Sequence, residues 1–596
     1  MRTNEIPERL EAMRKFMGEN NLDAFIIPST DAHLSEYPPK YWESRKWISG
    51  FSGSAGTAVV TKDKAGVWTD SRYFIQAAEE LKDTGFDLFK MGQPDTPDMT
   101  AWIIEQVGTE GTVGIDGLVY ASSDAKSLKD KLDAKDINLN TDFDPFSSIR
   151  TDRPEIPKNQ IFTLPVEVAG ETVKSKIDRI NAELKKLEAD GIIIVTLDAV
   201  AWTFNMRGND VEYNPVAVAY AYVSENETVL FIDPDKINED AAGEYKEQGI
   251  KISDYNNIFE YVANLPENNT VCVTGSKINW KLLQTIPESC KIIDVPSPVD
   301  LMKSIKNATE LNGFRNAMIR DGLALVKFYM WLEEAIPAGE VTEVMVEEKL
   351  LEYRSQQEMF VGESFGTIAG YAGNGAIVHY HATPENCLTI KPEGLLLIDS
   401  GGQYKDGTTD ITRTVAAGKL TRQMKADYTN VLKGHIAIAT AIYPEGTRGS
   451  QLDVLARKAL WDNGLTYWHG TGHGIGHFLN VHEGPQNIRL EENPTLLKPG
   501  MVTSNEPGVY RANQYGIRIE NLIVTQEYQK TEEFGTFYNF ETITLCPIDT
   551  KPISKKLLTK SEKRWLNSYH KMVYKKLKRY LSKEEKVWLK NKTKPI

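Results

Sequence analysis

The sequence predicts a mixed α/β (α+β) protein with two similar α/β domains, a larger α/β domain and a short helical C-terminal extension. The chain has 596 residues, 41% hydrophobic and 26% charged, so it is globular but too long for a single hydrophobic core. Short apolar runs alternate with segments whose apolar residues recur at helical spacing. The second quarter of the chain also repeats the order of these segments in the first quarter.

The first predicted domain, residues 1–157, combines an amphipathic helix with short strands. Its segments are a helix over 8–20 and strands over 22–28, 47–61 and 66–74. The last strand contains Arg72, an isolated basic residue that is typical either of a surface ion pair or of a ligand contact. A proline-rich polar segment, 142–158, predicts a linker to the next domain.

The second predicted domain, residues 158–305, looks like a duplicate of the first. Its matching segments are a helix over 173–189 and strands over 191–196, 216–223 and 228–232. An aspartate follows the first buried strand in both copies, Asp31 in one and Asp198 in the other. Two α/β units of similar size in tandem indicate duplication.

The third predicted domain, residues 306–547, begins with helices over 308–335 and 341–356 and contains most of the polar residues suited to chemistry. The extension, 548–596, is basic and helical. Its apolar stripe consists of Trp565, Leu566, Tyr569, Met572, Val573 and Leu577. Such a stripe on a terminal helix is more typical of a docking surface or a dimer contact than of a nucleic-acid-binding helix.

Charge and cysteine usage exclude several classes of function. The formal net charge of −14 argues against a general affinity for nucleic acid or an anionic membrane. The four cysteines are widely spaced and form no CxxC pair, so neither a disulfide framework nor a thiolate metal site is expected. No apolar run approaches the roughly 18 residues of a membrane span, and the first residues lack the apolar core of a signal peptide. We therefore expect a cytoplasmic protein.

A predicted hairpin over residues 395–415, LLLIDSGGQYKDGTTDITRTV, places two carboxylates on neighbouring strands. An apolar run ends at Asp399, glycines and an Asp-Gly pair supply the turn, and a β-branched run containing Asp410 returns. Adjacent carboxylates repel each other. Either both therefore face water, or a cationic group lies between them.

Six of the nine histidines fall in two short windows. These are His379 and His381 in the first window, and His469, His473, His477 and His482 in the second. The glycines between the members of the second window disfavour a helix. We therefore expect an extended segment with the side chains of His469, His473 and His477 on one face.

Two glutamates, Glu506 and Glu520, lie in strand-like apolar segments, where a carboxylate is costly unless it is paired or bound to a metal. Arg518 precedes Glu520 by two residues, so a structural ion pair between them is an alternative interpretation. The full candidate set is Asp399, Asp410, His473, Glu506 and Glu520.

Four carboxylates and one imidazole match the charge of two divalent cations. Oxygen-rich ligation favours Mn2+, with Co2+, Fe2+ or Zn2+ also possible. Two such ions roughly 3.5 to 4 Å apart could share a bridging hydroxide and polarise a carbonyl, which predicts hydrolysis without a protein nucleophile.

The ordered motifs IDSGGQYKDGTTD, HGTGHGIG, NVHEGP, NEPGVY and GIRIEN resemble those of the pita-bread metallopeptidases. The resemblance to the long, three-domain aminopeptidase P (Xaa-Pro aminopeptidase) group extends over nearly the whole chain and includes STDAHLSEY, GFSGSAGTAVVT, WTDSRYF and WLNSYH. It implies two tandem creatinase-type N-terminal domains, a pita-bread catalytic domain and release of the first residue from peptides with proline at position two.

The resemblance also implies roles for individual residues. Asp399 would chelate one metal, Asp410 and Glu520 would bridge both, and His473 and Glu506 would complete the coordination. Glu506 would also move a proton from the bridging water. His379, His469 and His482 would surround the substrate, orient the scissile carbonyl and the proline and shuttle protons, so that His379 and His482 are implied catalytic residues together with Glu506. Two arginines complete the implied substrate-binding set: Arg518, which supports the ligand carboxylates, and Arg72, at the mouth of the site. The two N-terminal copies would narrow access to the site, and the WLNSYH segment would fit a contact in a homodimer.

Three rival interpretations remain open from the sequence. The segment 362–366, GESFG, matches the nucleophile elbow of α/β-hydrolases, although its glycines make the required helix poor. Prolidase, an Xaa-Pro dipeptidase, shares the five ligands but typically has one N-terminal domain, and creatinase shares the fold without metal. A noncatalytic binding module on the same fold is opposed by the intact ligand set.

Overall fold

The structure is a computed structural model that describes residues 5–596. It divides into two compact units. The first contains the chain up to Leu164 together with Glu171–Val299, and the second contains Pro165–Gly170 together with Asp300–Ile596. No helix within the described residues is long and apolar enough to cross a membrane.

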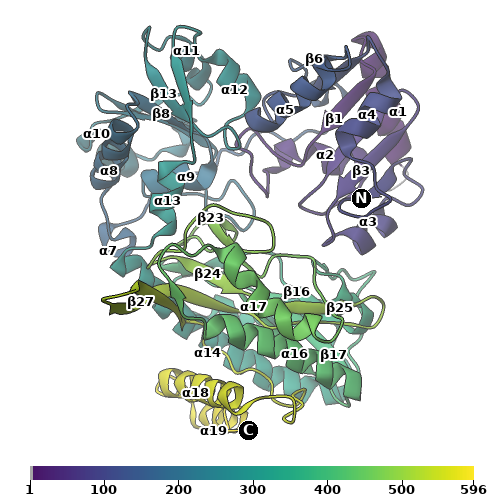
Figure 1. Ribbon diagram of the computed structural model, residues 1–596, viewed down its shortest axis with the longest axis vertical. Helices are drawn as coiled ribbons and strands as arrows, with labels where there is room; N and C mark the ends of the chain where they lie inside the picture. Colours follow the sequence, from purple (N-terminus) through teal and green to yellow (C-terminus); the bar gives the residue numbers. More distant parts are fainter. Residues whose placement is uncertain (1–4) are drawn as a thin grey trace. The chain divides into compact units, whose positions relative to one another are not determined.

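Two six-stranded sheets form the first unit (Figure 1), and the first sheet has the order β4-β3-β2-β1-β5-β6. Its strands are β1 (Ala24–Ile27), β2 (Thr57–Thr61), β3 (Ala65–Thr69), β4 (Asp87–Lys90), β5 (Thr112–Ile115) and β6 (Asn138–Asn140). Its helices are α1 (Ile6–Glu19), α2 (Ser44–Ser49), α3 (Phe74–Glu80), α4 (Met99–Val107), α5 (Ser122–Asp133) and α6 (Phe146–Ile149), with the 3₁₀ turn η2 (Lys40–Trp42). Trp47 lies in α2, so the strand predicted from residue 47 is wrong at its start.

The second sheet has the order β12-β11-β10-β8-β13-β14. Its strands are β8 (Gly191–Ile194), β10 (Ala219–Ser224), β11 (Thr228–Ile232), β12 (Ile250–Ser253), β13 (Thr270–Val273) and β14 (Lys291–Asp294). Its helices are α8 (Val173–Lys186), α9 (Leu197–Thr203), α10 (Glu239–Glu247), α11 (Asn257–Ala263) and α12 (Trp280–Thr285), with the 3₁₀ turn η3 (Pro234–Lys236) between β11 and α10. Helix α13 (Pro298–Ser304) follows β14 in the chain. A short pair, β7 (Phe162–Thr163) and β9 (Met206–Arg207), completes the regular structure, and α7 (Val166–Ala169) belongs to the other unit.

Strand directions in the two sheets show the predicted duplication. In each copy the first strand pairs antiparallel with the second and parallel with the fifth, as β1 does with β2 and β5, and β8 with β10 and β13. The third and fourth strands are parallel in both sheets. The buried, β-branched first strands, such as Gly191–Ile194, hold the centre of each sheet.

The second unit begins with helices and a three-stranded sheet, β16-β17-β20. The elements of this first half are α14 (Ala308–Ala338), α15 (Glu343–Ser355), β15 (Phe360–Glu363), β16 (Ile368–Tyr371), η4 (Ala372–Ala376), β17 (Leu395–Ser400), β18 (Gly402–Tyr404), β19 (Gly407–Thr408) and β20 (Ile411–Ala416). β17 and β20 are antiparallel, with Asp399 opposite Thr412, which confirms the predicted hairpin.

The second half of this unit contains a six-stranded sheet, β21-β28-β27-β24-β22-β23, and the hairpin β25-β26. Its elements are α16 (Arg422–Ala439), β21 (Tyr443–Pro444), α17 (Gly449–Trp461), β22 (Gly472–Gly474), β23 (Glu483–Ile488), β24 (Val502–Asn505), β25 (Gly508–Arg511), β26 (Tyr515–Arg518), β27 (Asn521–Thr531) and β28 (Gly535–Thr542). Two helices, α18 (Lys560–Leu577) and α19 (Lys583–Lys592), end the chain.

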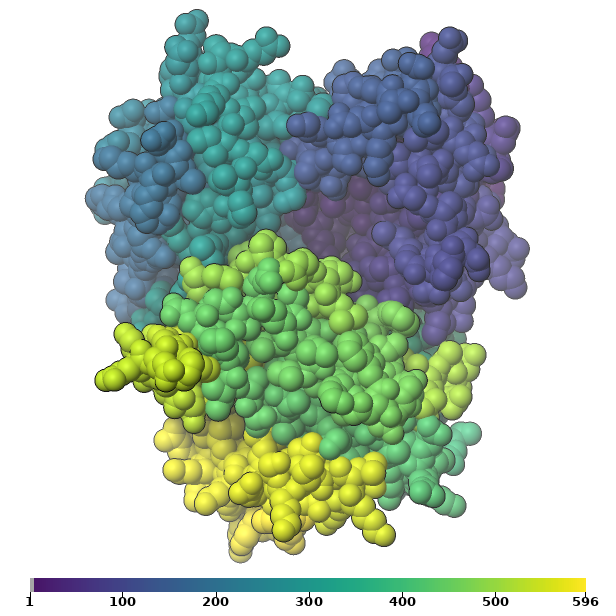
Figure 2. All heavy atoms as spheres, in the orientation of Figure 1, coloured from purple at the N-terminus to yellow at the C-terminus, as the bar shows by residue number. Residues whose placement is uncertain are grey.

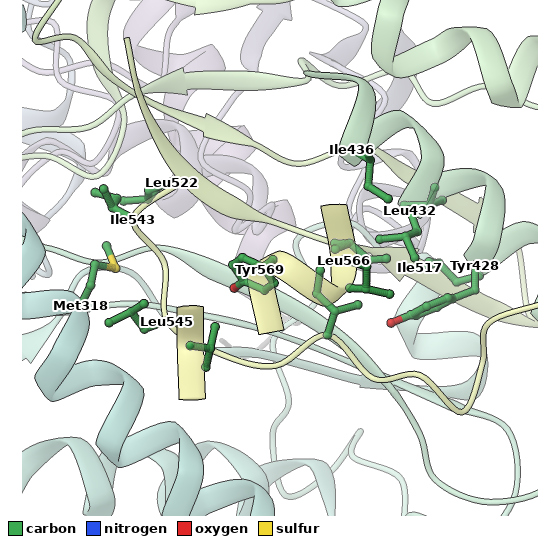
Figure 3. Packing of buried hydrophobic residues seen from close by; sticks show 14 of the residues in the cluster. Met318, Tyr428, Leu432, Ile436, Ile517, Leu522, Ile543, Leu545, Leu566 and Tyr569 are labelled. Carbon is green, nitrogen blue, oxygen red and sulfur yellow. The ribbon is translucent and has the colours of Figure 1, made fainter. Parts of the chain in front are cut away.

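The C-terminal helices pack on this unit and share its core. In Figure 2 the yellow C-terminal residues continue the surface of the green part of the chain. Figure 3 shows Leu566 and Tyr569 of α18 among Tyr428 and Leu432 of α16 and Ile517 of β26, all in one buried cluster. The predicted apolar stripe therefore docks on the chain's own core, and a dimer contact made by the extension would have to use other residues.

Arg413 joins α18 to the strands beneath it. Its guanidinium is buried and donates to the backbone carbonyls of Glu520 and Cys546, and to the hydroxyl of Tyr569 at 2.9 Å. A buried charge of this kind is tolerated only when its donors are satisfied. One side chain on β20 thus links the predicted hairpin to the C-terminal helix.

Replacing Leu566 by alanine tests whether α18 is part of the folding core. Leu566 is fully buried, so Leu566→Ala should lower the free energy of unfolding by about 2 to 5 kcal/mol. The matched control is Leu557→Ala, because Leu557 is 45% exposed and its loss should change stability by about 0.5 kcal/mol or less. Denaturant unfolding of both variants measures the difference, and equal effects would contradict the assignment.

Candidate metal centre

Asp410, His473 and Glu520 come from three separated parts of the chain and converge in the second unit. Their ligand atoms all lie within 4.8 Å of one another, and Nε2 of His473 is 3.5 Å from Oδ2 of Asp410. Nδ1 of His473 donates to the carbonyl of Gly474 at 2.9 Å. In the neutral ring this leaves the lone pair of Nε2 directed at the carboxylates, which is the tautomer that a metal ligand needs.

Glu506 lies beside the same imidazole. Its Oε1 is 3.5 Å from Nε2 of His473 and accepts a hydrogen bond of 3.2 Å from the hydroxyl of Ser504. The oxygen of that hydroxyl in turn accepts from the backbone N–H of His473 at 3.0 Å. Ser504 therefore fixes the relative positions of the two predicted ligands.

Asp399, on β17, presents two different oxygens. Its Oδ2 accepts from Nη2 of Arg518 at 2.5 Å. Its Oδ1 is buried and has no hydrogen-bond partner within residues 5–596. A buried carboxylate oxygen without a donor is costly unless a cation meets it, so this oxygen fits a metal ligand.

Arg518 organises the carboxylates from one side. Besides Asp399, its guanidinium donates to the hydroxyl of Thr412 at 3.1 Å and to that of Tyr510 at 2.6 Å. Thr412 links Arg518 to Glu520, because the hydroxyl of Thr412 also donates to Oε2 of Glu520 at 2.8 Å. The alternative interpretation of the sequence paired Arg518 with Glu520. It is wrong, because Arg518 forms its ion pair with Asp399.

The electrostatics of this cluster favour cations. Burial, together with the nearby charges of Asp399 and Glu506, raises the pKa of Asp410 well above its usual range. Burial and the charge of Asp410 do the same to the pKa of Glu520, and burial raises the pKa of Glu506 to about 7. Arg518 is a single positive charge among four carboxylates. Divalent cations would keep these groups ionised, so the residues present fit a metal centre with mostly oxygen ligands.

The three histidines predicted to bind substrate lie in different surroundings. The ring of His482 is 4.3 Å from that of His473, centroid to centroid. Nδ1 of His469 donates to the carbonyl of Gly470 at 2.7 Å, and its Nε2 is 2.8 Å from the hydroxyl of Tyr510. His379 is half-buried in the irregular loop that follows η4. His482 and His469 are thus tied to the cluster, directly or through Tyr510.

Arg72 belongs to the first unit. It follows β3 and forms an ion pair with Asp70 at 2.8 Å and a longer one with Glu36 at 3.8 Å. Within the first unit Arg72 is therefore an ion-pair partner, which is one of the two interpretations that the sequence allowed.

His477 does not share the face predicted for it. Only Gly472–Gly474 forms a strand, and the pairing of β22 shifts register after His473. His477 is buried instead against α14, where Nδ1 is 4.0 Å from Glu310 and the ring is 5.6 Å from that of Phe314. The extended segment predicted over 469–477 is therefore wrong at its C-terminal end.

The nucleophile-elbow interpretation of GESFG is also wrong. A strand, β15, does enter the segment, but β16 follows it where the elbow requires a helix. Ser364 is buried, and its hydroxyl donates to the carbonyl of Thr409 at 2.8 Å. The serine therefore has a structural partner inside the sheet region.

Sequence reasoning missed the residues that hold the ligands in place. These residues are Thr412, Ser504 and Tyr510. Each lies within a quoted motif or beside a predicted ligand, so proximity in the chain was their only signal.

A second group supports the segment before His473. Asp453 and Arg457, one turn apart on α17, are buried, and the carboxylate accepts from Thr471 at 2.5 Å while the guanidinium donates to the carbonyl of His469 at 2.9 Å.

Comparisons with known families cover nearly the whole chain. The model described as metallopeptidase family M24 matches residues 312–527, which contain the cluster. The creatinase/prolidase N-terminal domain is matched twice, at residues 9–149 and 152–310, and the C-terminal region of peptidase M24 at residues 536–596. The two matched N-terminal segments correspond to the two sheets of the first unit.

Full-length relatives share this organisation. A probable Xaa-Pro aminopeptidase P of Coprinopsis cinerea is 42% identical over 100% of this chain and 99% of its own. One of Botryotinia fuckeliana is 41% identical over 99% and 93%.

Solved structures extend the comparison from the sequence to the fold. The crystal structure of X-prolyl aminopeptidase from Caenorhabditis elegans, described as a cytosolic enzyme with a di-nuclear active site, has a TM-score of 0.95 at 34% identity and covers 100% of both chains. The Xaa-Pro dipeptidase of Bacillus anthracis shares the fold over 63% of this chain and 99% of its own, with a TM-score of 0.51 at 23% identity. Two creatinase-type domains, a pita-bread domain, a C-terminal helical region and relatives that match over the full length thus place this chain in metallopeptidase family M24, as a member of its Xaa-Pro aminopeptidase group.

Proposed function

We propose that this chain hydrolyses the first peptide bond of peptides with proline at position two and releases the N-terminal residue. The observation that carries the proposal is the convergence of four carboxylates and one imidazole around Arg518, with a buried oxygen of Asp399 that lacks a donor. The names of the relatives that match the full length of the chain support the choice of substrate.

The proposed metal ligands are Asp399, Asp410, His473, Glu506 and Glu520, which would hold two divalent cations. Together with Arg518 the ionised donors leave about three negative charges, which two divalent ions and one hydroxide would balance. When bound, such a pair supplies Lewis acidity and lowers the pKa of water enough to make hydroxide available near neutral pH. The oxygen-rich donor set favours Mn2+ over the other divalent ions.

Glu506 is the proposed group that moves a proton. Burial raises its pKa to about 7, whereas the positive charge of Arg518 opposes the shift. With cations bound the carboxylate would be ionised, and an ionised carboxylate beside the attacking water can accept a proton. Glu506 would take the proton of the attacking water and deliver it to the proline nitrogen as the peptide bond breaks.

The proposed substrate contacts surround this group. His482 lies beside His473, and together with His379 it would orient the scissile carbonyl and the proline. His469 and Arg518 meet at the hydroxyl of Tyr510, so their proposed contribution is to fix that wall of the site. Arg72 stays a proposed contact from the N-terminal region.

Three further properties are proposed on the same basis. We propose domain boundaries after residues 157, 305 and 547, with catalysis in residues 306–547. A cytoplasmic location is supported by the C. elegans enzyme, which is described as cytosolic. The homodimer stays a prediction, which light scattering of the purified protein would measure.

Removal of metal tests the proposal directly. Dialysis against a chelator should abolish cleavage of an Xaa-Pro-Yaa tripeptide, and Mn2+ should restore it best among the divalent ions, with two ions bound per chain. An Xaa-Pro dipeptide is the control substrate and should be cleaved more slowly, because the proposed reaction is that of an aminopeptidase. Undiminished activity without metal, or preference for the dipeptide, would contradict the proposal.

Asp410→Asn should abolish turnover without unfolding the protein. Losing one of the charged ligands should lower kcat by about a thousandfold or more, equivalent to about 4 kcal/mol of transition-state stabilisation. Without metal, the variant should be at least as heat-stable as the wild type, because a carboxylate that repels Asp399 and Glu506 is gone.

The control for Asp410→Asn is Asp462→Asn. Asp462 is exposed at the end of α17 and forms an ion pair with Lys458, so its loss should leave kcat unchanged. Wild-type rates in Asp410→Asn would show that the cluster does not hold the catalytic metal.

Arg518→Lys should separate charge from geometry. Lysine keeps the positive charge but cannot donate in three fixed directions to Asp399, Thr412 and Tyr510. We expect a loss of about 10- to 100-fold in kcat/KM or in metal affinity. Arg511→Lys is the matched control, since Arg511 pairs with Asp427 on α16 instead. Equal small effects in both variants would mean that the charge alone matters.

A further inference from the structure

An irregular loop carries one of the proposed substrate-binding residues. One buried carboxylate accepts hydrogen bonds from two residues of this loop, and an isolated backbone bridge joins Thr389 of the loop to Thr342. Between η4, which ends at Ala376, and β17, which starts at Leu395, the chain forms no helix or named strand. His379 lies in this loop. A loop without a ladder of backbone hydrogen bonds needs other contacts to hold one conformation.

Glu343, the first residue of α15, supplies those contacts. It is fully buried. Its carboxylate accepts from the backbone N–H of Leu388 at 2.7 Å and from the hydroxyl of Tyr380, the neighbour of His379, at 2.9 Å. The same carboxylate also accepts from the side-chain amide of Asn374, at 2.9 Å to Oε2, and from the backbone N–H of Tyr371 at 2.6 Å.

Two of these four donors, Tyr371 and Asn374, lie in β16 and η4 just before the loop, and the other two, Tyr380 and Leu388, lie within it. Tyr371 ends β16, and β16 pairs with β17 so that Ile368 lies opposite Asp399. Glu343 thus ties the loop to the strand next to a proposed metal ligand. Its place in the first turn of a helix also favours a negative charge there.

Two further groups hold the same stretch. The carboxylate of Glu347, one turn further along α15, lies against the backbone N–H of Ala382. The side chain of Asn386 donates to the carbonyl of His381 at 3.2 Å and accepts from the backbone N–H of Thr383 at 2.6 Å. The backbone on the C-terminal side of His379 is therefore held from α15 and from within the loop. The hydroxyl of Tyr380, beside His379, donates to Glu343 at 2.9 Å, accepts from the side chain of Asn374 at 2.9 Å and lies 3.2 Å from Oδ1 of Asn386.

We propose that Glu343 is a positioning residue for the peptidase reaction, which holds the loop of residues 377–390 so that His379 points at the substrate. The inference rests on the proposed function of His379 as a substrate contact. Glu343 itself would touch neither substrate nor metal, and its effect would pass through Tyr380, Asn374 and Leu388.

The test is a double-mutant cycle with Glu343→Gln and His379→Ala, assayed on an Xaa-Pro-Yaa tripeptide with Mn2+ present. Glutamine keeps the shape but turns an N–H group toward at least one donor and removes the charge. Glu343→Gln alone should lower kcat/KM by about 10- to 100-fold, mostly through a higher KM, since a displacement of about 1 Å costs on that order. In the His379→Ala background it should cost less than about threefold, because the residue that it positions is gone.

Two controls separate positioning from general damage. Glu348→Gln changes an exposed carboxylate on the same helix and should leave kcat/KM unchanged. Tyr380→Phe removes only the hydroxyl that reaches Glu343, so it should reproduce part of the loss and keeps the proposal testable should Glu343→Gln fold poorly. Hydrogen exchange should become faster in residues 377–390 of Glu343→Gln and stay unchanged over β17 and β20.

The outcomes distinguish this inference from the proposed function. Equal losses from Glu343→Gln with and without His379, or a wild-type KM and unchanged exchange in the loop, would overturn the inference while the peptidase assignment stands. A wild-type protein that cleaves no Xaa-Pro peptide would overturn the proposed function. The exchange measurement would then still decide whether Glu343 holds the loop.

Discussion

Repulsion between buried carboxylates is the constraint on which the second unit depends. Asp399, Asp410, Glu506 and Glu520 lie within mutual electrostatic range, and burial and neighbouring charges raise the pKa of three of them. A fold can keep such a group only where positive charge is supplied. Arg518 supplies one charge and divalent cations would supply the remainder, so metal binding and the stability of this region are linked.

Buried arginines form the frame around that cluster. Arg518 reaches Asp399 directly and Glu520 through Thr412, whereas Arg413 joins β20 to the C-terminal helix through Tyr569. Arg457 holds the backbone ahead of His473. Each guanidinium offers several donors in fixed directions, so each one ties together segments that are distant in sequence. The geometry of the proposed ligands thus depends on side chains outside the ligand set.

The proposed metal ligands and the proposed substrate contact His379 are held in place by different kinds of hydrogen bond. The proposed metal ligands lie on or beside strands of paired sheets, where backbone hydrogen bonds fix their positions. The proposed substrate contact His379 lies on an irregular loop instead. The carboxylate of Glu343, on the neighbouring helix α15, accepts hydrogen bonds from this loop. Substrate-binding loops can vary in length and sequence on a constant scaffold, and such loops need anchors of this kind.

Local pattern determined much of this protein. Alternation and turn residues predicted the hairpin of Asp399 and Asp410, repetition of segment order predicted the two similar sheets, and residue type predicted the candidate ligands, because each depends on neighbours in the chain. Tertiary structure alone decided that His477 packs on α14, that Arg518 pairs with Asp399, and that Leu566 is covered by α16 and β26. These outcomes depend on contacts between residues separated by tens to hundreds of positions, which periodicity cannot encode.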